Sequence, residues 1–132
     1  MTREDKELLL EDLCSRLPYG VKVQVDLQSD TYSPIVCKVC SVECAEIGST
    51  FIGVETSPDT YNEFREFLCK PYLFPLSSMT EEQNLEYLRT CMGGNGSVPT
   101  LTSFEWFNKN HFDYRGLIEK GLAIDATDKN IY

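Results

Sequence analysis

The sequence predicts an α+β fold in which an N-terminal helix precedes a small antiparallel sheet, and two to three C-terminal helices cover one face of it. Three observations predict this: apolar residues recur at helical spacing near the N-terminus, alternate with polar residues from position 21, and return to helical spacing after position 80. Helices segregated from a run of strands are typical of α+β folds. A chain of 132 residues can bury a core of its own, so we expect one domain spanning 1–132.

An amphipathic helix is expected over residues 3–16. Apolar side chains recur there at the helical period, with charged residues between them: Leu9, Leu10, Leu13, Cys14 and Leu17. Proline lacks a backbone N–H, and glycine readily leaves the helical conformation. We therefore expect Pro18 and Gly20 to end this helix.

A β meander is expected over residues 21–54. Its clearest strand alternates apolar and polar positions, with an apolar face made of Val21, Val23, Val25 and Leu27. Two further β-like stretches cover residues 35–47 and 51–54. These strands are compatible with an open sheet and also with a barrel-like curl.

Residues 57–75 carry a mixed pattern. Apolar side chains at helical spacing favour a short helix after Ser57: Tyr61, Phe64, Phe67 and Leu68. Pro71 and Pro75 then bracket residues 72–74, and proline disfavours a helix both at its own position and just before it. Residues 72–74 are therefore expected to be extended and to pack on the sheet.

The C-terminal part, residues 80–121, is predicted to be mainly helical. Thr80 and Gln83 match a capping box, which favours a helix over residues 81–92. The glycine-rich residues 93–97 break that helix.

An aromatic helical unit is expected over residues 103–121. A first helix is expected to break near His111, and Asp113 to cap a second short helix that ends at Gly121. The polar tail from Thr127 is expected to fray.

The charge balance limits the classes of partner. Twenty-one acidic residues against twelve basic ones give a net charge of -9, which repels a phosphate backbone. We therefore expect no direct nucleic-acid binding. The acidity either keeps the protein in solution or imitates nucleic acid toward a basic groove on another protein.

The sequence also predicts a cytoplasmic protein. It holds no apolar run near the roughly 20 residues that span a bilayer. The charged N-terminal residues 1–6 do not resemble a signal peptide. In that compartment the six cysteines are expected to be mostly reduced thiols.

A cysteine cluster, Cys37, Cys40 and Cys44, provides the alternative function of a thiol-dependent or zinc-dependent protein. Closely spaced thiolates can share a tetrahedral zinc ion. However, a structural zinc site usually needs a second ligand pair, and positions three apart on a strand face opposite sides. We therefore expect small apolar residues of a core strand, with no metal and no cofactor.

No catalytic motif stands out, so we expect a protein that is not an enzyme. His111 is the only histidine, and its spacing from Phe104 and Phe107 places it on or beside an apolar helix face. No second residue can be assigned to a general acid or base pair with it.

The residues chosen as candidates for binding lie in the aromatic unit: Trp106, His111, Tyr114 and Arg115. Tryptophan, tyrosine and arginine dominate hot spots of protein interfaces. Most of this unit is expected to be core, with part of it at a partner surface.

Three stretches resemble a known group of proteins: residues 13–24 with LPYGVKVQ, residues 70–82 with KPYLFPLSSMTEE, and residues 106–123 with WFNKNHFDYRGLIEKGLA. Together they are similar to small uncharacterised proteins of gut-bacterial genomes, phages and mobile elements. The resemblance implies a setting and no activity, and residues 30–69 depart most from it. We therefore expect an accessory binding module of phage or mobile-element origin that contacts a host or phage protein.

Overall fold

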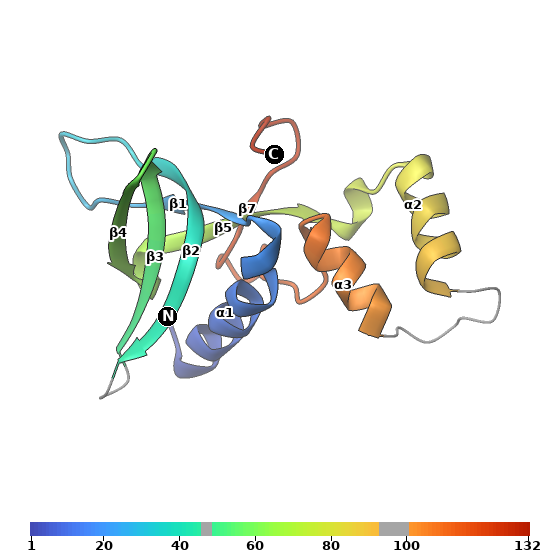
Figure 1. The fold of residues 1–132 in the computed structure, drawn as a ribbon, viewed down its shortest axis with the longest axis horizontal. Helices are drawn as coiled ribbons and strands as arrows, with labels where there is room; N and C mark the ends of the chain where they lie inside the picture. Colours follow the sequence, from blue (N-terminus) through green and yellow to red (C-terminus); the bar gives the residue numbers. More distant parts are fainter. Residues whose placement is uncertain (46–48, 93–100) are drawn as a thin grey trace.

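The structure, a computed structural model, describes residues 1–45, 49–92 and 101–132 (Figure 1). The predicted break over residues 93–97 and the end of the predicted stretch 35–47 lie outside the described residues. The described elements begin with a long helix, continue with five strands, and end with two helices and two very short strands.

Helix α1 (Arg3–Arg16) confirms the predicted helix over residues 3–16. It begins with a capping box, in which the Thr2 side chain accepts a hydrogen bond from the Asp5 N–H and the Asp5 carboxylate accepts one from the Thr2 N–H. A short 3₁₀ turn follows, and Gly20 adopts a φ of +70°, which a residue with a side chain rarely does. These features end α1 where the sequence predicted.

The sheet is open and mixed. Its main strands are β1 (Lys22–Val25), β2 (Ile35–Ala45), β3 (Ser49–Ser57), β4 (Thr60–Arg65) and β5 (Cys69–Pro75). They pair antiparallel in the order β4-β3-β2-β1-β5, while β6 (Phe112–Asp113) and β7 (Ile124–Asp125) pair parallel with β5. The antiparallel meander is confirmed. The barrel-like alternative is wrong, because β4 pairs with β3 alone among the described strands.

The main core lies between α1 and one face of the sheet. Its buried side chains are Leu9, Leu13, Val21, Val23, Val25, Cys37, Val39, Ile52, Val54 and Cys69. The sequence placed the C-terminal helices over this face, but α1 covers it, and the two C-terminal helices lie beyond the far end of β5 (Figure 1). The leucines of α1 therefore provide the helical half of this core.

The predicted short helix after Ser57 is wrong, because those residues form β4 and a 3₁₀ turn over residues 66–68. Asp59 has a φ of +61° in the tight connection between β3 and β4. The pairing places Phe64 opposite Ile52, with Phe64 packed against the core. Long-range strand pairing has outweighed the helical spacing of the aromatic residues.

The two C-terminal helices are α2 (Glu81–Tyr87), which continues as a π-helical turn over Leu88–Met92, and α3 (Leu101–Lys109). The capping box is confirmed, since the Thr80 hydroxyl accepts from the Gln83 N–H and the Gln83 side chain accepts from the Thr80 N–H. Both helices lie where helical spacing predicted them.

The second short helix after His111 does not form. The Asp113 carboxylate instead accepts hydrogen bonds of 2.9 Å from the N–H groups of Leu117 and Ile118, so it caps a turn. Gly116 has a φ of +77°, which leaves the helical region. Phe112 and Asp113 instead form β6 and pair with β5, and this pairing overrides the helical pattern of the sequence.

The tail also differs from expectation, because Tyr132 packs against the domain. Its hydroxyl donates to the Tyr72 carbonyl at 2.8 Å and accepts from the Lys22 N–H at 2.9 Å. The Tyr132 ring stacks on His111 with the ring centroids 3.7 Å apart. The Tyr132 hydroxyl thus links the C-terminal tail both to the start of β1 and to β5.

Replacing Tyr132 by phenylalanine is expected to lower the free energy of unfolding by about 1–2 kcal/mol, because two backbone groups lose their partner. Urea unfolding measures this. Tyr61→Phe is the matched control. It removes the same hydroxyl oxygen, but from a side chain that is 62% exposed and open to solvent. Equal losses for the two variants would contradict a structural role for the Tyr132 hydroxyl.

Candidate functional site

The structure separates the four binding candidates into two pairs. Trp106 and His111 are only 6% and 8% exposed, whereas Tyr114 and Arg115 line a surface cleft between α1 and α3. The sequence placed all four in one aromatic unit. Tyr114 and Arg115 thus line an open space large enough to receive a ligand.

Trp106 belongs to an aromatic cluster inside the C-terminal part. Its ring stacks on Phe112 at a centroid distance of 5.6 Å and contacts Tyr87 and Phe107 at 5.3 and 5.9 Å. Aromatic pairs at these distances stabilise beyond the area they bury. Trp106 therefore joins α2, α3 and β6.

His111 adopts a left-handed conformation with a φ of +61°. Burial, together with the positive charges of Arg16 and Lys22, lowers the pKa of His111 to about 4. The imidazole is therefore neutral at pH 7, and its Nδ1 is buried without a hydrogen-bond partner among the described residues. Its carbonyl oxygen accepts from the Phe74 N–H at 2.8 Å, so the residue anchors β5.

The three residues of the cysteine cluster differ in burial. Cys37 is buried in the main core, while Cys40 and Cys44 are exposed. A register shift between Val39 and Ser41 places Cys40 at a bulge. Within residues 1–45, 49–92 and 101–132, no three metal-ligating side chains come together.

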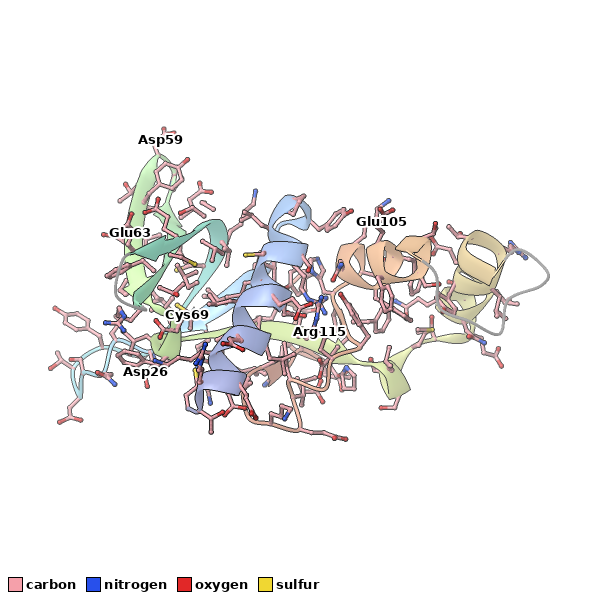
Figure 2. All side chains as sticks on the ribbon, turned by 90° about the horizontal axis from the view of Figure 1, so that it is seen from below. Asp26, Asp59, Glu63, Cys69, Glu105 and Arg115 are labelled. Carbon is pink, nitrogen blue, oxygen red and sulfur yellow. The ribbon has the colours of Figure 1, made fainter. Side chains whose placement is uncertain are left out.

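The cleft between α1 and α3 has a volume of about 440 Å³. Its lining residues are Glu11, Ser15, Phe104, Glu105, Asn108, Tyr114 and Arg115. Figure 2 shows Arg115 between α1 and the C-terminal part, and Glu105 on α3. The volume lies within the roughly 300–1,000 Å³ of typical small ligand sites.

Beneath the cleft lies a buried charge network centred on Asp12, which is 0% exposed. Its carboxylate accepts from the Arg16 Nε at 2.9 Å and from the Arg115 Nη1 at 3.0 Å. Arg16, also fully buried, donates in addition to the Phe112 carbonyl oxygen at 2.6 Å. The network joins α1 to the segment after α3 and holds Arg115 in place.

Tyr114 forms the floor of the cleft. Its ring stacks on Phe107 and contacts Phe104 at centroid distances of 5.6 and 5.3 Å, and its hydroxyl donates to Asn108 Oδ1 at 3.0 Å. The Arg115 guanidinium carbon lies 4.6 Å from the ring centroid, which is a cation–π contact. The floor is therefore fixed by contacts within the protein.

The rim carries the groups that remain open to a ligand. Phe104 is 40% exposed, and Glu105, the next residue on α3, is exposed and makes no ion pair with the described residues. From the other helix, the Glu11 side chain is 68% exposed and lies 3.8 Å from Arg115. An exposed aromatic side chain in a cleft that is also lined by two carboxylates favours positive charge.

The cleft includes a serine whose hydroxyl makes its hydrogen bonds within the protein. Among the described residues that line the cleft, Ser15 is the serine, and its hydroxyl donates to the Glu11 carbonyl oxygen while accepting from Arg115. No histidine or thiol is among the described residues that line the cleft. A serine without an adjacent base is a weak nucleophile.

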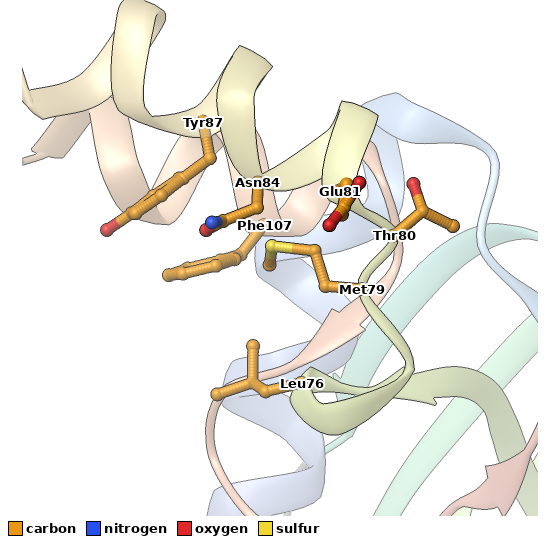
Figure 3. A pocket seen from close by; sticks show the side chains of 7 residues that line it. All are labelled: Leu76, Met79, Thr80, Glu81, Asn84, Tyr87 and Phe107. Carbon is orange, nitrogen blue, oxygen red and sulfur yellow. The ribbon is translucent and has the colours of Figure 1, made fainter.

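A second hollow of about 450 Å³ lies between α2 and α3 (Figure 3). Its lining residues are Leu76, Met79, Thr80, Glu81, Asn84, Tyr87 and Phe107. Figure 3 shows Tyr87 and Phe107 as its aromatic walls, with Met79 beside them. The charge on its wall comes from Glu81, so this hollow offers less to distinguish one ligand from another.

Sequence reasoning missed Glu11, Ser15, Phe104, Glu105 and Asn108 as cleft residues. They come from two helices about 90 positions apart, and no spacing along the chain brings them together. The missing information was that α3 packs beside α1.

Comparison with known proteins adds no relative. No family model matches the chain, and neither a curated protein nor a solved structure matches it. In the part of the chain that the structure describes, no helix combines the length and apolar character needed to cross a membrane.

Proposed function

We propose that this protein is a non-catalytic binding module that contacts another protein through the cleft between α1 and α3. The supporting observation is the cleft itself, which is lined by the exposed Phe104 together with the exposed carboxylates of Glu11 and Glu105. Exposed aromatic residues beside charged groups are typical of interface hot spots.

The resemblance of residues 106–123 supports a setting in a phage or mobile element. The partner is then a host or phage protein, and an accessory protein of this kind acts in the cytoplasm. The net charge of -9 favours a partner with a basic surface. Nucleic acid is disfavoured by the same charge.

Capture from a lysate of a gut bacterium that carries such elements tests the proposal. Glu105→Lys is expected to lower the yield of the captured partner at least tenfold, because it puts a positive charge on the rim. The matched control is Glu63→Lys, the same charge change on β4 away from the cleft (Figure 2). Equal capture by both variants and the wild-type protein would sink the proposal.

A further inference from the structure

The charges of the cleft are not evenly available to a ligand. The two terminal nitrogens of Arg115 already donate to Asp12 and Ser15, and its side chain is only 15% exposed. An incoming anion would have to displace these contacts. The positive charge of the site is therefore largely neutralised from within the protein.

The negative charges are the accessible ones. Glu11 is 68% exposed with a single contact of 3.8 Å to Arg115, and Glu105 is exposed without an ion pair among the described residues. Glu11 lines the cleft from α1, while Glu105 and Phe104 line it from α3. A ligand that enters meets carboxylates on two sides and an aromatic ring.

From this arrangement we propose that the cleft takes an arginine side chain of the partner protein, which deepens and rests on the proposed function. A guanidinium is planar, so it can stack on the exposed face of Phe104 while donating to a carboxylate in a forked geometry. Its three methylene groups match the apolar part of the wall. A lysine ammonium lacks both the plane and the fork.

A contact of the same type, between an arginine, an aromatic ring and a carboxylate, exists within the protein. Arg115 packs 4.6 Å from the Tyr114 ring centroid while its guanidinium donates to the Asp12 carboxylate. Phe104 with Glu11 and Glu105 repeats this combination of ring and carboxylate at the surface, without a cation of its own beyond the contact of Glu11 to Arg115.

Titration of the full ¹⁵N-labelled chain with N-acetyl-arginine methylamide tests the proposal by amide chemical shifts. Shifts are expected at residues lining the cleft, with a dissociation constant in the millimolar range. The neutral analogue of the same shape, N-acetyl-citrulline methylamide, is expected to bind about tenfold more weakly, because both the cation–π contact and the ion pair are lost.

Variants identify the groups responsible. Glu105→Gln and Phe104→Leu are each expected to weaken arginine binding severalfold, because they remove the charge and the aromatic face at nearly constant volume. Both side chains are exposed, so the fold is retained, and unchanged amide shifts elsewhere verify this. Glu63→Gln on β4 is the matched control and is expected to bind as the wild-type protein does.

Three results would overturn the assignment: equal binding of citrulline, equal binding of N-acetyl-lysine methylamide, or shifts spread over the acidic surface instead of the cleft. If Glu105→Lys loses the lysate partner while arginine gives no shifts, the proposed function stands and the arginine assignment fails. If arginine binds in the cleft but capture is unchanged by Glu105→Lys, the proposed function fails.

Discussion

Replacing Asp12 by alanine is expected to lower the free energy of unfolding by about 3–5 kcal/mol. Its carboxylate accepts from Arg16 at 2.9 Å and from Arg115 at 3.0 Å, and both Asp12 and Arg16 are 0% exposed. Without it the Arg16 guanidinium remains buried with no counter-charge, which is the costly half of a broken buried ion pair. Urea unfolding followed by circular dichroism measures the loss.

The chain contains a matched control on the same helix. Arg3 and Glu7 form an ion pair of the same 2.9 Å and the same spacing of four residues, but their side chains are 91% and 64% exposed. Glu7→Ala is expected to cost at most about 0.5 kcal/mol. Similar losses for Asp12→Ala and Glu7→Ala would show that burial does not set the strength of this network.

Lowering the pH from 7 to 4 is expected to destabilise the protein through His111. The pKa of His111 is lowered to about 4 by burial and by the charges of Arg16 and Lys22, whereas the unfolded chain has an ordinary value near 6.5. Between these values the unfolded state binds a proton that the folded state does not, so stability falls as the pH falls. The stability that depends on a neutral His111 is fully present above pH 6.5, and about 3 kcal/mol of the free energy of unfolding is lost by pH 4.

The His111→Asn variant isolates this contribution from the carboxylates that titrate in the same range. Asparagine tolerates the φ of +61° found at this position and carries no titratable proton. Between pH 7 and pH 5 the wild-type protein is expected to lose about 2 kcal/mol more than the variant. Parallel stability curves for the two proteins would contradict a lowered pKa at His111.

Local signals in the sequence predicted much of the fold. The helix over residues 3–16, the strand alternation after Val21 and the capping box at Thr80 are all confirmed. Each depends on residues a few positions apart, so their physical causes are present in a short segment. The same holds for the Asp113 cap, although it closes a turn and not a helix.

The errors have a common physical reason. Residues 60–65 and 112–113 pair with β3 and β5, and the partners of these strands are chosen by tertiary packing. The tail from Thr127 was expected to fray, yet the Tyr132 hydroxyl forms hydrogen bonds with the Lys22 N–H and the Tyr72 carbonyl, both far away in the chain. Sequence periodicity carries no information about which distant residues pair.

The sequence by itself determined the α+β class, the acidity and the location of the aromatic unit, because these follow from composition and from local periodicity. Only the tertiary structure decided which members of that unit are accessible. Arg16 and Phe112 are 96 positions apart, and their hydrogen bond places α1 beside the segment that carries Tyr114 and Arg115. That contact forms the cleft, while the same packing buries Trp106 and His111.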